Sequence, residues 1–425
     1  MSAVRIGIAG LGTVGAGVVR ILRRQGPLLE QRSGRAIEIV AVNARDRAKD
    51  RGVQLSSYDW EDDPVALARR ADIDVFVELI GGDEGPAKDA VEAALDAGRD
   101  VVTANKALLA VHGRALAERA EANGATIRYE AAVAGGIPCV KALSEGLGAN
   151  GIERVMGVMN GTCNFILTKM QDEGLPYETV FDEANALGYL EADPTLDVGG
   201  IDAAHKLAIL SALAFGTAPA FGDVEIEGIE RVTIRDIRHA AEMGYRIKLL
   251  GVAQMTGRGL EQRMSPCLVP ETSPFGQLDG ATNMVAFDGD ASGRIVMRGA
   301  GAGEGPTASA VVADILDIAR GLRPPVFGVP VADLTEAKPA QSATPASYYL
   351  RLSLPDRPGM LAKVAAALGE AGVSVDRMRQ LGHEDETAPV LIVTHKAPRR
   401  DVMAALDAMD GILAEPPVAL RIEAV

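Results

Sequence analysis

The feature that most constrains the fold is a glycine-rich run between an apolar strand and a helix near the N-terminus. Residues 4–9 (VRIGIA) predict a short buried strand, and residues 16–24 have helical spacing. Between them lies GLGTVG, which comprises Gly10, Gly12, Thr13, Val14 and Gly15. The glycines permit a tight turn, close approach of a pyrophosphate and helix–strand packing, and the helix N-terminus attracts the anion. A packing turn that binds nothing is the alternative, but the strand–turn–helix context favours dinucleotide binding.

The end of the second strand bears on which dinucleotide binds. Residues 37–42 (IEIVAV) predict that strand, and Asn43 and Ala44 follow it, where an NAD-selective domain usually places an acid. Arg45 comes next and could meet a 2′-phosphate, so we expect NADP, with NAD still possible because an acid can come from elsewhere. A solvated basic loop explains Arg45 equally well.

Further strands and helices alternate through the first third of the chain. Strands are predicted at 74–80, 100–103 and 126–130, and helices at 86–97 and 107–123. This alternation predicts a Rossmann-type, doubly wound parallel sheet. Ligands bind at the carboxyl ends of such strands, which is where Lys106 falls. We therefore expect Lys106 to have a functional role rather than to be merely exposed.

Length, charge and cysteine usage limit the remaining possibilities. The 425 residues are enough for about three domains. The net charge of −15 argues against nucleic acid and anionic membranes as partners. Cys139, Cys163 and Cys267 are widely spaced, without a zinc pattern, and their odd number fits a reducing compartment. With neither a signal peptide nor a long apolar run, the chain is expected to be cytoplasmic.

A glycine-rich turn and a second turn open the middle of the chain. Residues 130–138 (EAAVAGGIP) leave the first sheet, and their carbonyls could ligate a hard cation, although the pattern is weak. A strand is predicted at 155–160, and Thr162 is expected to cap the helix that follows. Cys163 is interpreted as a half-buried structural thiol. A nucleophile would need a base, and the pairing with His205 is speculative.

The most informative segment runs from residue 188 to 206. An apolar helix is predicted at 203–215. The loop before it carries four acidic residues: Glu191, Asp193, Asp197 and Asp202. Asp202 is either a helix cap or the partner of Lys206, which is four residues away on the same face. A lysine held beside acids can donate a proton and polarise a carbonyl, and the other acids can hold an ammonium group. The residues thus suggest carbonyl reduction on a cationic or zwitterionic small molecule.

This segment resembles the signature of the homoserine dehydrogenases. The glycine motif, ANKALLA around Lys106, EAAVAGGIP and NGTCNFI resemble that family in the same order, over about residues 4–325. Leu190 departs from the family, which usually has a small residue there, so the local shape of the site is in doubt. The resemblance implies reversible NAD(P)-dependent reduction of aspartate 4-semialdehyde to homoserine, in threonine, methionine and isoleucine biosynthesis.

The same resemblance assigns roles to individual residues. Lys206 resembles the catalytic lysine that protonates the carbonyl oxygen, with Lys106 assisting. Glu191 and Asp202 resemble the residues that hold the substrate's amino group, and Gly188 lines the site. The family's loop for a monovalent cation such as Na⁺ corresponds to Glu130, Val133, Gly135 and Ile137. Gly303 precedes a helix at about 307–322, and in this family that helix returns to the nucleotide domain. On spacing alone, Gly303 is simply a glycine that caps the helix.

The C-terminal part predicts a separate regulatory domain. Strands at 348–354, 373–381, 390–394 and 417–422, with helices at 360–371 and 400–409, give a βαββαβ order and a ferredoxin-like α+β domain. DRPGML and GVSV resemble an ACT domain, which implies an amino-acid effector, with threonine expected; a purely structural dimerisation domain is the alternative. The expected domains are a nucleotide-binding Rossmann domain at 1–134, an α+β catalytic and dimerisation domain at 135–323, and the regulatory ACT domain at 347–425. A linker is expected at 324–346.

Three functions remain in competition at this point. The first is a homoserine dehydrogenase, monofunctional because no kinase-sized segment precedes residue 4, and a homodimer or homotetramer. The second is a thiol-dependent semialdehyde dehydrogenase that uses Cys163 and phosphate. The third is a non-catalytic sensor of NADP and an amino acid. Loss of activity in Lys206→Ala with cofactor binding retained would single out the first.

Overall fold

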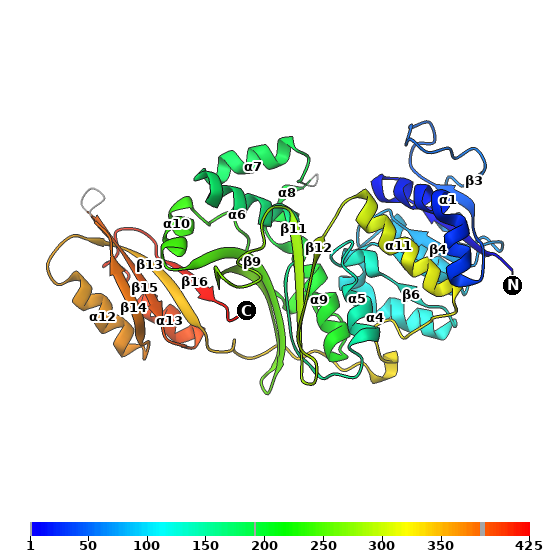
Figure 1. Ribbon diagram of the computed structural model, residues 1–425. Helices are drawn as coiled ribbons and strands as arrows, with labels where there is room; N and C mark the ends of the chain where they lie inside the picture. Colours follow the sequence, from blue (N-terminus) through cyan, green and yellow to red (C-terminus); the bar gives the residue numbers. More distant parts are fainter. Residues whose placement is uncertain (1, 191–192, 383–386) are drawn as a thin grey trace.

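The computed structural model describes residues 2–190, 193–382 and 387–425. Figure 1 shows an elongated arrangement, with the N-terminal domain (blue and cyan) at one end, the middle domain (green) at the centre and the C-terminal domain (orange) at the other end. Among the described residues, no helix combines the length and the hydropathy needed to cross a membrane.

The N-terminal domain is built on a parallel sheet. Its strands are β1 (Val4–Ala9), β2 (Ile37–Asn43), β3 (Asp59–Trp60), β4 (Val75–Glu78), β5 (Asp100–Thr103) and β6 (Ile127–Arg128). They lie in the order β3-β2-β1-β4-β5-β6, which is the order of the doubly wound dinucleotide-binding fold. The predicted fold class is confirmed. The short strand β3 was not predicted, because two residues carry no periodic signal.

Helices cover both faces of this sheet, and one of them comes from far along the chain. They are α1 (Thr13–Ser33), α2 (Pro64–Ala68), α3 (Pro86–Asp96), α4 (Lys106–Ala122) and α11 (Glu304–Ala319). Helix α11 packs on α1 (Figure 1), where a Cβ at Gly17 would lie 2.9 Å from the Cβ of Ala308. Helix α11 begins earlier than predicted because Pro306 lies in its first turn, where proline costs no hydrogen bond. Helix α1 is longer than predicted and runs through Pro27.

The middle domain pairs a long sheet with a layer of helices. Its strands are β7 (Ile152–Val158), β8 (Glu225–Ile226), β9 (Tyr245–Thr256), β10 (Gly259–Pro270), β11 (Thr282–Gly289) and β12 (Gly293–Ala300). Its helices and single turns are η1 (Glu130–Ala132), α5 (Cys139–Lys141), η2 (Ala142–Gly146), α6 (Gly161–Glu173), α7 (Tyr177–Ala186), α8 (Pro194–Val198), α9 (Ile201–Phe215), η3 (Phe221–Asp223), α10 (Ile234–Glu242) and η4 (Val331–Asp333). The sequence did not predict strands β9 to β12.

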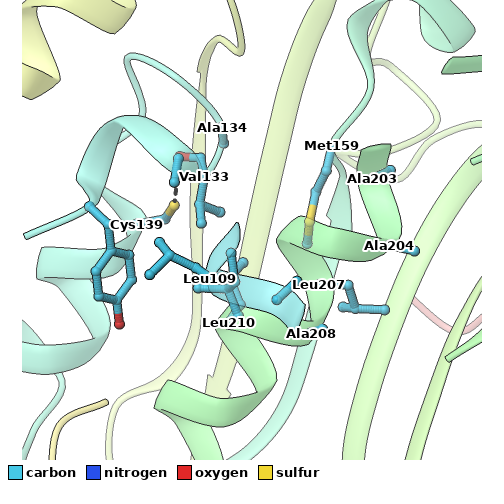
Figure 2. Packing of buried hydrophobic residues seen from close by; sticks show 14 of the residues in the cluster. Leu109, Val133, Ala134, Cys139, Met159, Ala203, Ala204, Leu207, Ala208 and Leu210 are labelled. Carbon is cyan, nitrogen blue, oxygen red and sulfur yellow. Dashed lines mark hydrogen bonds between the residues drawn. The ribbon is translucent and has the colours of Figure 1, made fainter. Parts of the chain in front are cut away.

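Helix α9 forms the centre of the core between the first two domains. Its residues from Leu207 to Ala212 are fully or almost fully buried, as its apolar sequence predicted. Figure 2 shows Leu207 and Leu210 of α9 close to Leu109 of α4 and to Val133, which precedes α5. The nucleotide-binding and middle domains therefore share one continuous core, which fixes the relative position of α4 and α9.

The C-terminal domain has the predicted ferredoxin-like order. Its elements are β13 (Ser347–Pro355), α12 (Met360–Glu370), β14 (Val375–Gln380), β15 (Thr387–Thr394), α13 (Arg399–Asp407) and β16 (Val418–Ile422). The strands lie in the order β16-β13-β15-β14, with antiparallel neighbours. Unexpectedly, β16 also pairs in parallel with β10, Cys267 opposite Arg421 and Leu268 opposite Ile422. The sheet of the C-terminal domain thus continues the sheet of the middle domain.

The segment predicted as a linker, residues 324–346, lies along the middle domain. The Leu260 N–H donates to the carbonyl of Lys338 at 2.8 Å, and the Ala340 N–H donates back to the carbonyl of Leu260 at 2.9 Å. The Ala218 N–H donates to the carbonyl of Thr335 at 3.0 Å. These bonds attach the proline-rich segment to the surface, so it does not act as a free tether.

Candidate active site

In the glycine turn after β1, neighbouring backbone leaves no room for a side chain at two of the glycines, whereas the third glycine has open space beside it. A Cβ at Gly10, where φ is +95°, would lie 2.3 Å from the Leu79 carbonyl oxygen. A Cβ at Gly15 would lie 2.1 Å from the Gly10 carbonyl oxygen. Around Gly12, no described residue comes within 4 Å of such a Cβ. Gly12 is also the residue before α1 and has no side chain to cap it. Open backbone at an uncapped helix N-terminus fits a pyrophosphate.

A cavity of about 630 Å³ lies between the nucleotide-binding and middle domains. Seven of the sixteen predicted site residues line it: Val14, Lys106, Gly135, Gly188, Asp202, Lys206 and Gly303. Asn160, Thr162 and Asp197 join them. Residues that are almost 300 positions apart in the sequence therefore face one space.

The charged centre of this cavity is a carboxylate between two lysines. Asp202 Oδ2 lies 2.7 Å from Lys206 Nζ, and Asp202 Oδ1 lies 3.1 Å from Lys106 Nζ. Lys206 Nζ also donates to the Met159 carbonyl at 2.9 Å. Asp202 and Lys206 are buried, whereas the Lys106 side chain is 30% exposed. Burial opposes the charge of Asp202, but the two ammonium groups outweigh it and hold the pKa of this carboxyl well below its usual range.

Local structure explains why the two lysines meet. Lys106 is the first residue of α4, and the Asn105 side chain caps that helix by accepting from the Leu108 N–H. Lys206 is one helical turn beyond Asp202 in α9, so both project from one face. The residue before α9 is Gly200, in the left-handed conformation with φ +81°. Asp202 is therefore an ion-pair partner, and the alternative that it merely caps the helix is wrong.

Asn160 is a site residue that sequence reasoning missed. Its Nδ2 donates to Asp197 Oδ1 at 2.9 Å and to Asp202 Oδ2 at 3.2 Å, while its Oδ1 accepts from the Cys163 N–H. Asn160 therefore caps α6 and fixes two carboxylates together. The prediction that Thr162 caps this helix is wrong, because the Thr162 hydroxyl donates to the Tyr189 carbonyl instead. An asparagine just before the Gly-Thr pair was the available signal.

Cys163 has the environment of a structural thiol. It is fully buried, and its Sγ donates to the Asp197 carbonyl at 3.2 Å. Burial, reinforced by the charge of Asp197, raises the pKa of this thiol well above its usual value. His205, the speculative base, instead stacks near Phe221, with ring centroids 4.2 Å apart. A thiolate nucleophile does not fit this position.

The predicted cation loop contains a buried acid with a raised pKa. The Glu130 carboxylate accepts from the backbone N–H groups of Val140 and Lys141, both at 2.9 Å. Burial and the neighbouring charge of Asp314 raise the pKa of Glu130 to about 7. The carbonyl of Val133 accepts from Cys139 Sγ, and that of Ile137 accepts from the Cys139 N–H. Each of these oxygens retains a second lone pair that can bind a cation.

Basic side chains follow the end of β2. Asn43 is buried and donates to the carbonyls of Glu61 and Asp62. Arg45 is exposed, and the Arg47 guanidinium lies 5.6 Å from the centre of the Trp60 ring. Arg51, which was not singled out from the sequence, donates to the Leu11 carbonyl of the glycine turn at 2.9 Å. Arg45 is thus available for a ligand.

One predicted substrate residue lies outside the described residues. This residue is Glu191, which follows the described range 2–190. Its neighbour Gly188 has φ +74° and no described residue within 4 Å of an added Cβ, which leaves this wall of the cavity open.

Family models match most of the chain, and known proteins match all of it. Residues 138–316 match the family "Homoserine dehydrogenase", residues 10–130 match "Homoserine dehydrogenase, NAD binding domain", and residues 348–411 match "ACT domain". The homoserine dehydrogenase of Neisseria gonorrhoeae is 44% identical, with 100% of each chain covered.

Solved structures agree with these matches. The crystal structure of a homoserine dehydrogenase from Thiobacillus denitrificans is similar with a TM-score of 0.94 and 42% identity, covering 100% of this chain and 98% of the other. A hyperthermophilic archaeal homoserine dehydrogenase in complex with NADPH is similar with a TM-score of 0.64 and 27% identity, covering 76% of this chain and 99% of the other.

Proposed function

The chain belongs to the homoserine dehydrogenase family of NAD(P)-dependent oxidoreductases, and from this premise we propose how its residues reduce aspartate 4-semialdehyde to homoserine. The observation that carries the proposal is the Asp202 carboxylate between the ammonium groups of Lys206 and Lys106, at 2.7 and 3.1 Å, in a cavity that also reaches Val14 of the glycine turn.

Lys206 is the proton donor. A bound nicotinamide supplies the hydride that reduces the aldehyde carbon. Lys206 Nζ, held by Asp202 and by the Met159 carbonyl, has one N–H left to aim at the aldehyde oxygen. As negative charge develops on that oxygen, the ammonium stabilises it and transfers its proton. Lys106, across the same carboxylate, adds a second positive charge and assists.

Asp202 has a double role in this proposal. Its carboxylate holds both ammonium groups in place, and a carboxylate has lone pairs left to accept from the substrate's ammonium group. We assign Glu191, which lies outside the described residues, to the same ammonium group, and Gly188 to the open wall beside it. Asn160 holds Asp202 through its amide and so positions the cluster without touching the reacting atoms.

For the cofactor we propose NADP, with NAD as a weaker alternative. Gly10, Gly12, Thr13, Val14 and Gly15 would hold the pyrophosphate, and Gly303 and Lys106 would border the nicotinamide. The exposed Arg45 lies just beyond β2, and Asn43, where an acid would select the ribose hydroxyls, is engaged by two carbonyls. The relative solved with NADPH supports this preference.

We also propose that Glu130, with the carbonyls of Val133, Gly135 and Ile137, binds a monovalent cation such as Na⁺. The buried carboxyl, with its pKa raised to about 7, gains most from a cation that stabilises its charged form. Exchange of Na⁺ for choline in the assay, in wild type and in Glu130→Gln, tests this assignment.

The C-terminal ACT domain leads to the remaining proposals. We propose threonine as its effector, and a homodimer or homotetramer in the cytoplasm as the working form. The partly exposed Ile295 and Val296 on the edge strand β12 favour assembly through the middle domain. Light scattering on purified protein measures the oligomeric state.

The decisive experiment is the initial rate of cofactor reduction with purified protein and homoserine, for NADP and NAD in turn. Homoserine-dependent reduction that is faster with NADP, and that disappears in Lys206→Ala while cofactor binding survives, supports the proposal. Absence of homoserine-dependent reduction with either cofactor overturns it.

A further inference from the structure

A second cavity, of about 120 Å³, lies where the regulatory sheet joins the middle sheet. One edge of β10 pairs with β8 at Arg263 and Met264, and the same edge pairs with β16 at Cys267 and Leu268. Ser265 and Pro266 lie between these two pairings and line the cavity. The cavity therefore occupies a gap in the sheet at the boundary between two domains.

The walls of this cavity come from both domains. Arg263 and Ser265 of β10 contribute one side, and Tyr348 of β13, Arg421 of β16 and Arg399 of α13 contribute the other. Arg263 and Tyr348 are each 4% exposed, and the Arg421 side chain is 10% exposed. A ligand in this space would touch the catalytic and regulatory parts of the chain at once.

The buried charges around the cavity form a network of ion pairs. Arg421 Nε lies 2.5 Å from Glu423 Oε1, Arg263 Nη1 lies 2.5 Å from Glu261 Oε1, and Arg154 and Arg263 also pair with Glu423. Burial opposes ionisation of Glu261 and Glu423, but the arginines hold the pKa of both carboxyls below the ordinary value. Arg399, Glu225 and Glu227 of the cavity lining bring the local count to four guanidinium groups and four carboxylates.

Two donors in this cluster have no acceptor. Arg263 Nε and Arg421 Nη1 are buried, and neither has a hydrogen-bond partner within the described part of the chain. Buried donors of charged groups are costly when left unpaired, so an acceptor at this place would be strongly bound. Unpaired arginine donors beside one small cavity are what a carboxylate requires.

The rim favours a zwitterion over a simple anion. Glu225 and Glu227 line the same cavity, and Glu225 lies 3.8 Å from Arg399 Nη1. These carboxylates repel a phosphate dianion but accept hydrogen bonds from an ammonium group. We propose that this junction cavity binds a small amino acid, with its carboxylate on Arg263 and Arg421 and its ammonium group toward Glu225 and Glu227. The inference rests on the proposed regulatory function of the ACT domain and gives it a location.

The cavity is also connected to the active site through a short stretch of backbone. After β8, the Glu227 N–H donates to the Met264 carbonyl, and the Ile229 N–H donates to the Val198 carbonyl at 2.9 Å. Val198 ends α8, directly before the turn that starts α9 and places Asp202. A ligand held by Glu225 and Glu227 would therefore act on the segment that supports the catalytic carboxylate.

The test is calorimetric titration of the full-length protein with L-threonine as the probe. Wild type is compared with Arg421→Gln, with the rim variant Arg399→Ala and with Arg400→Ala, an exposed neighbour that does not line the cavity. We expect the Kd for threonine to rise about tenfold in Arg421→Gln, the scale of one charge-assisted hydrogen bond, and about threefold in Arg399→Ala. Arg400→Ala should bind as wild type does, and L-threoninamide and inorganic phosphate should bind at least about tenfold more weakly.

Three results would overturn the inference. They are no binding of threonine to wild type at millimolar concentration, unchanged binding in both Arg421→Gln and Arg399→Ala, and phosphate binding as tight as that of threonine. Because Arg399 is on the rim, Arg399→Ala still measures the contribution of the cavity to threonine binding if Arg421→Gln fails to fold. Homoserine oxidation by wild type without threonine is measured beside these titrations. Its absence would reject the proposed function, whereas the titrations alone decide the location of the amino-acid site.

Discussion

The active site and the junction with the regulatory domain both bury carboxylates among cations, but with different cations. In the active site Asp202 contacts two lysines, and the cluster lines a cavity of about 630 Å³. At the junction Glu261 and Glu423 contact arginines from β7, β10 and β16. A lysine ammonium is a compact donor that can give up a proton, whereas an arginine keeps its charge and binds carboxylates through a planar fork. Lysine therefore suits chemistry, and arginine suits the joining of domains.

The largest expected effect comes from removal of the lysine donor. Lys206→Ala should lower kcat about a thousandfold, because a positioned general acid contributes between about a hundredfold and ten-thousandfold. Lys206→Arg sharpens the comparison, since it keeps the charge beside Asp202 but cannot release a proton, so its activity should also stay low. Steady-state rates with homoserine, together with cofactor binding by fluorescence, measure both variants. Recovery of activity in Lys206→Arg would mean that charge alone is needed.

At the junction with the C-terminal domain, the expected effect of a substitution is a loss of folding stability. Glu423→Gln leaves buried arginines without their partner and should destabilise the protein by about 3 kcal/mol at pH 7. Because the pKa of Glu423 is lowered in the folded state, its contribution is present above the unfolded pKa of about 4.3 and is lost as the pH falls below it. Thermal unfolding is measured at pH 7 and at acid pH. The difference in melting temperature between Glu423→Gln and wild type should be smaller at acid pH.

Glu415→Gln is the matched control for that measurement. This carboxylate is about half exposed, and its ion pairs with Arg235 and Arg351 are 3.6 and 3.8 Å long. Its loss should cost less than about 1 kcal/mol at either pH. Equal effects of the two substitutions would contradict the view that the buried arginine cluster joins the domains.

A smaller effect is expected at the exposed end of β2. Arg45→Ala should raise the KM for NADP about tenfold and leave that for NAD nearly unchanged, because one hydrogen bond to a charged phosphate contributes roughly 1.5 kcal/mol. Arg47→Ala is the comparison, since its guanidinium already lies beside Trp60. If the loss occurs in Arg47→Ala instead, the assignment of Arg45 to the phosphate is wrong.

The smallest effect should come from Cys163. Cys163→Ala should keep kcat within about threefold of wild type, because the buried thiol, with its raised pKa, takes no part in a lysine mechanism. The same rate assay measures it. Loss of turnover comparable to that of Lys206→Ala, in a variant with an unchanged melting temperature, would revive the thiol mechanism.

Prediction from the sequence worked best where chemistry and periodicity lie close together in the chain. Gly10, Gly12 and Gly15 between a strand and a helix indicated the nucleotide-binding fold, and the spacing of Asp202 and Lys206 placed both on one face of a helix. Strands β9 to β11 were missed because they are largely buried, without the polar alternation of a half-exposed strand, and β12 was missed because it is exposed along most of its length and has no buried face to alternate with. Asn160 was overlooked because its contacts are with Asp197 and Asp202, about forty residues away.

By itself, then, the sequence determined the local structures and the chemical inventory of the protein: a glycine turn, an aspartate with a lysine one turn later, and a βαββαβ regulatory unit. Only the tertiary structure decided that Lys106 shares the carboxylate of Asp202. The return of α11 to the nucleotide domain was implied by the family resemblance but by no local signal in the sequence. The tertiary structure also decided that β16 continues the middle sheet and leaves a cavity beside Arg263 and Arg421. The physical reason is the distance along the chain over which each interaction acts. The signals for helices and turns come from residues only a few positions apart. Ion pairs and strand registers depend on burial between segments that the sequence keeps far apart.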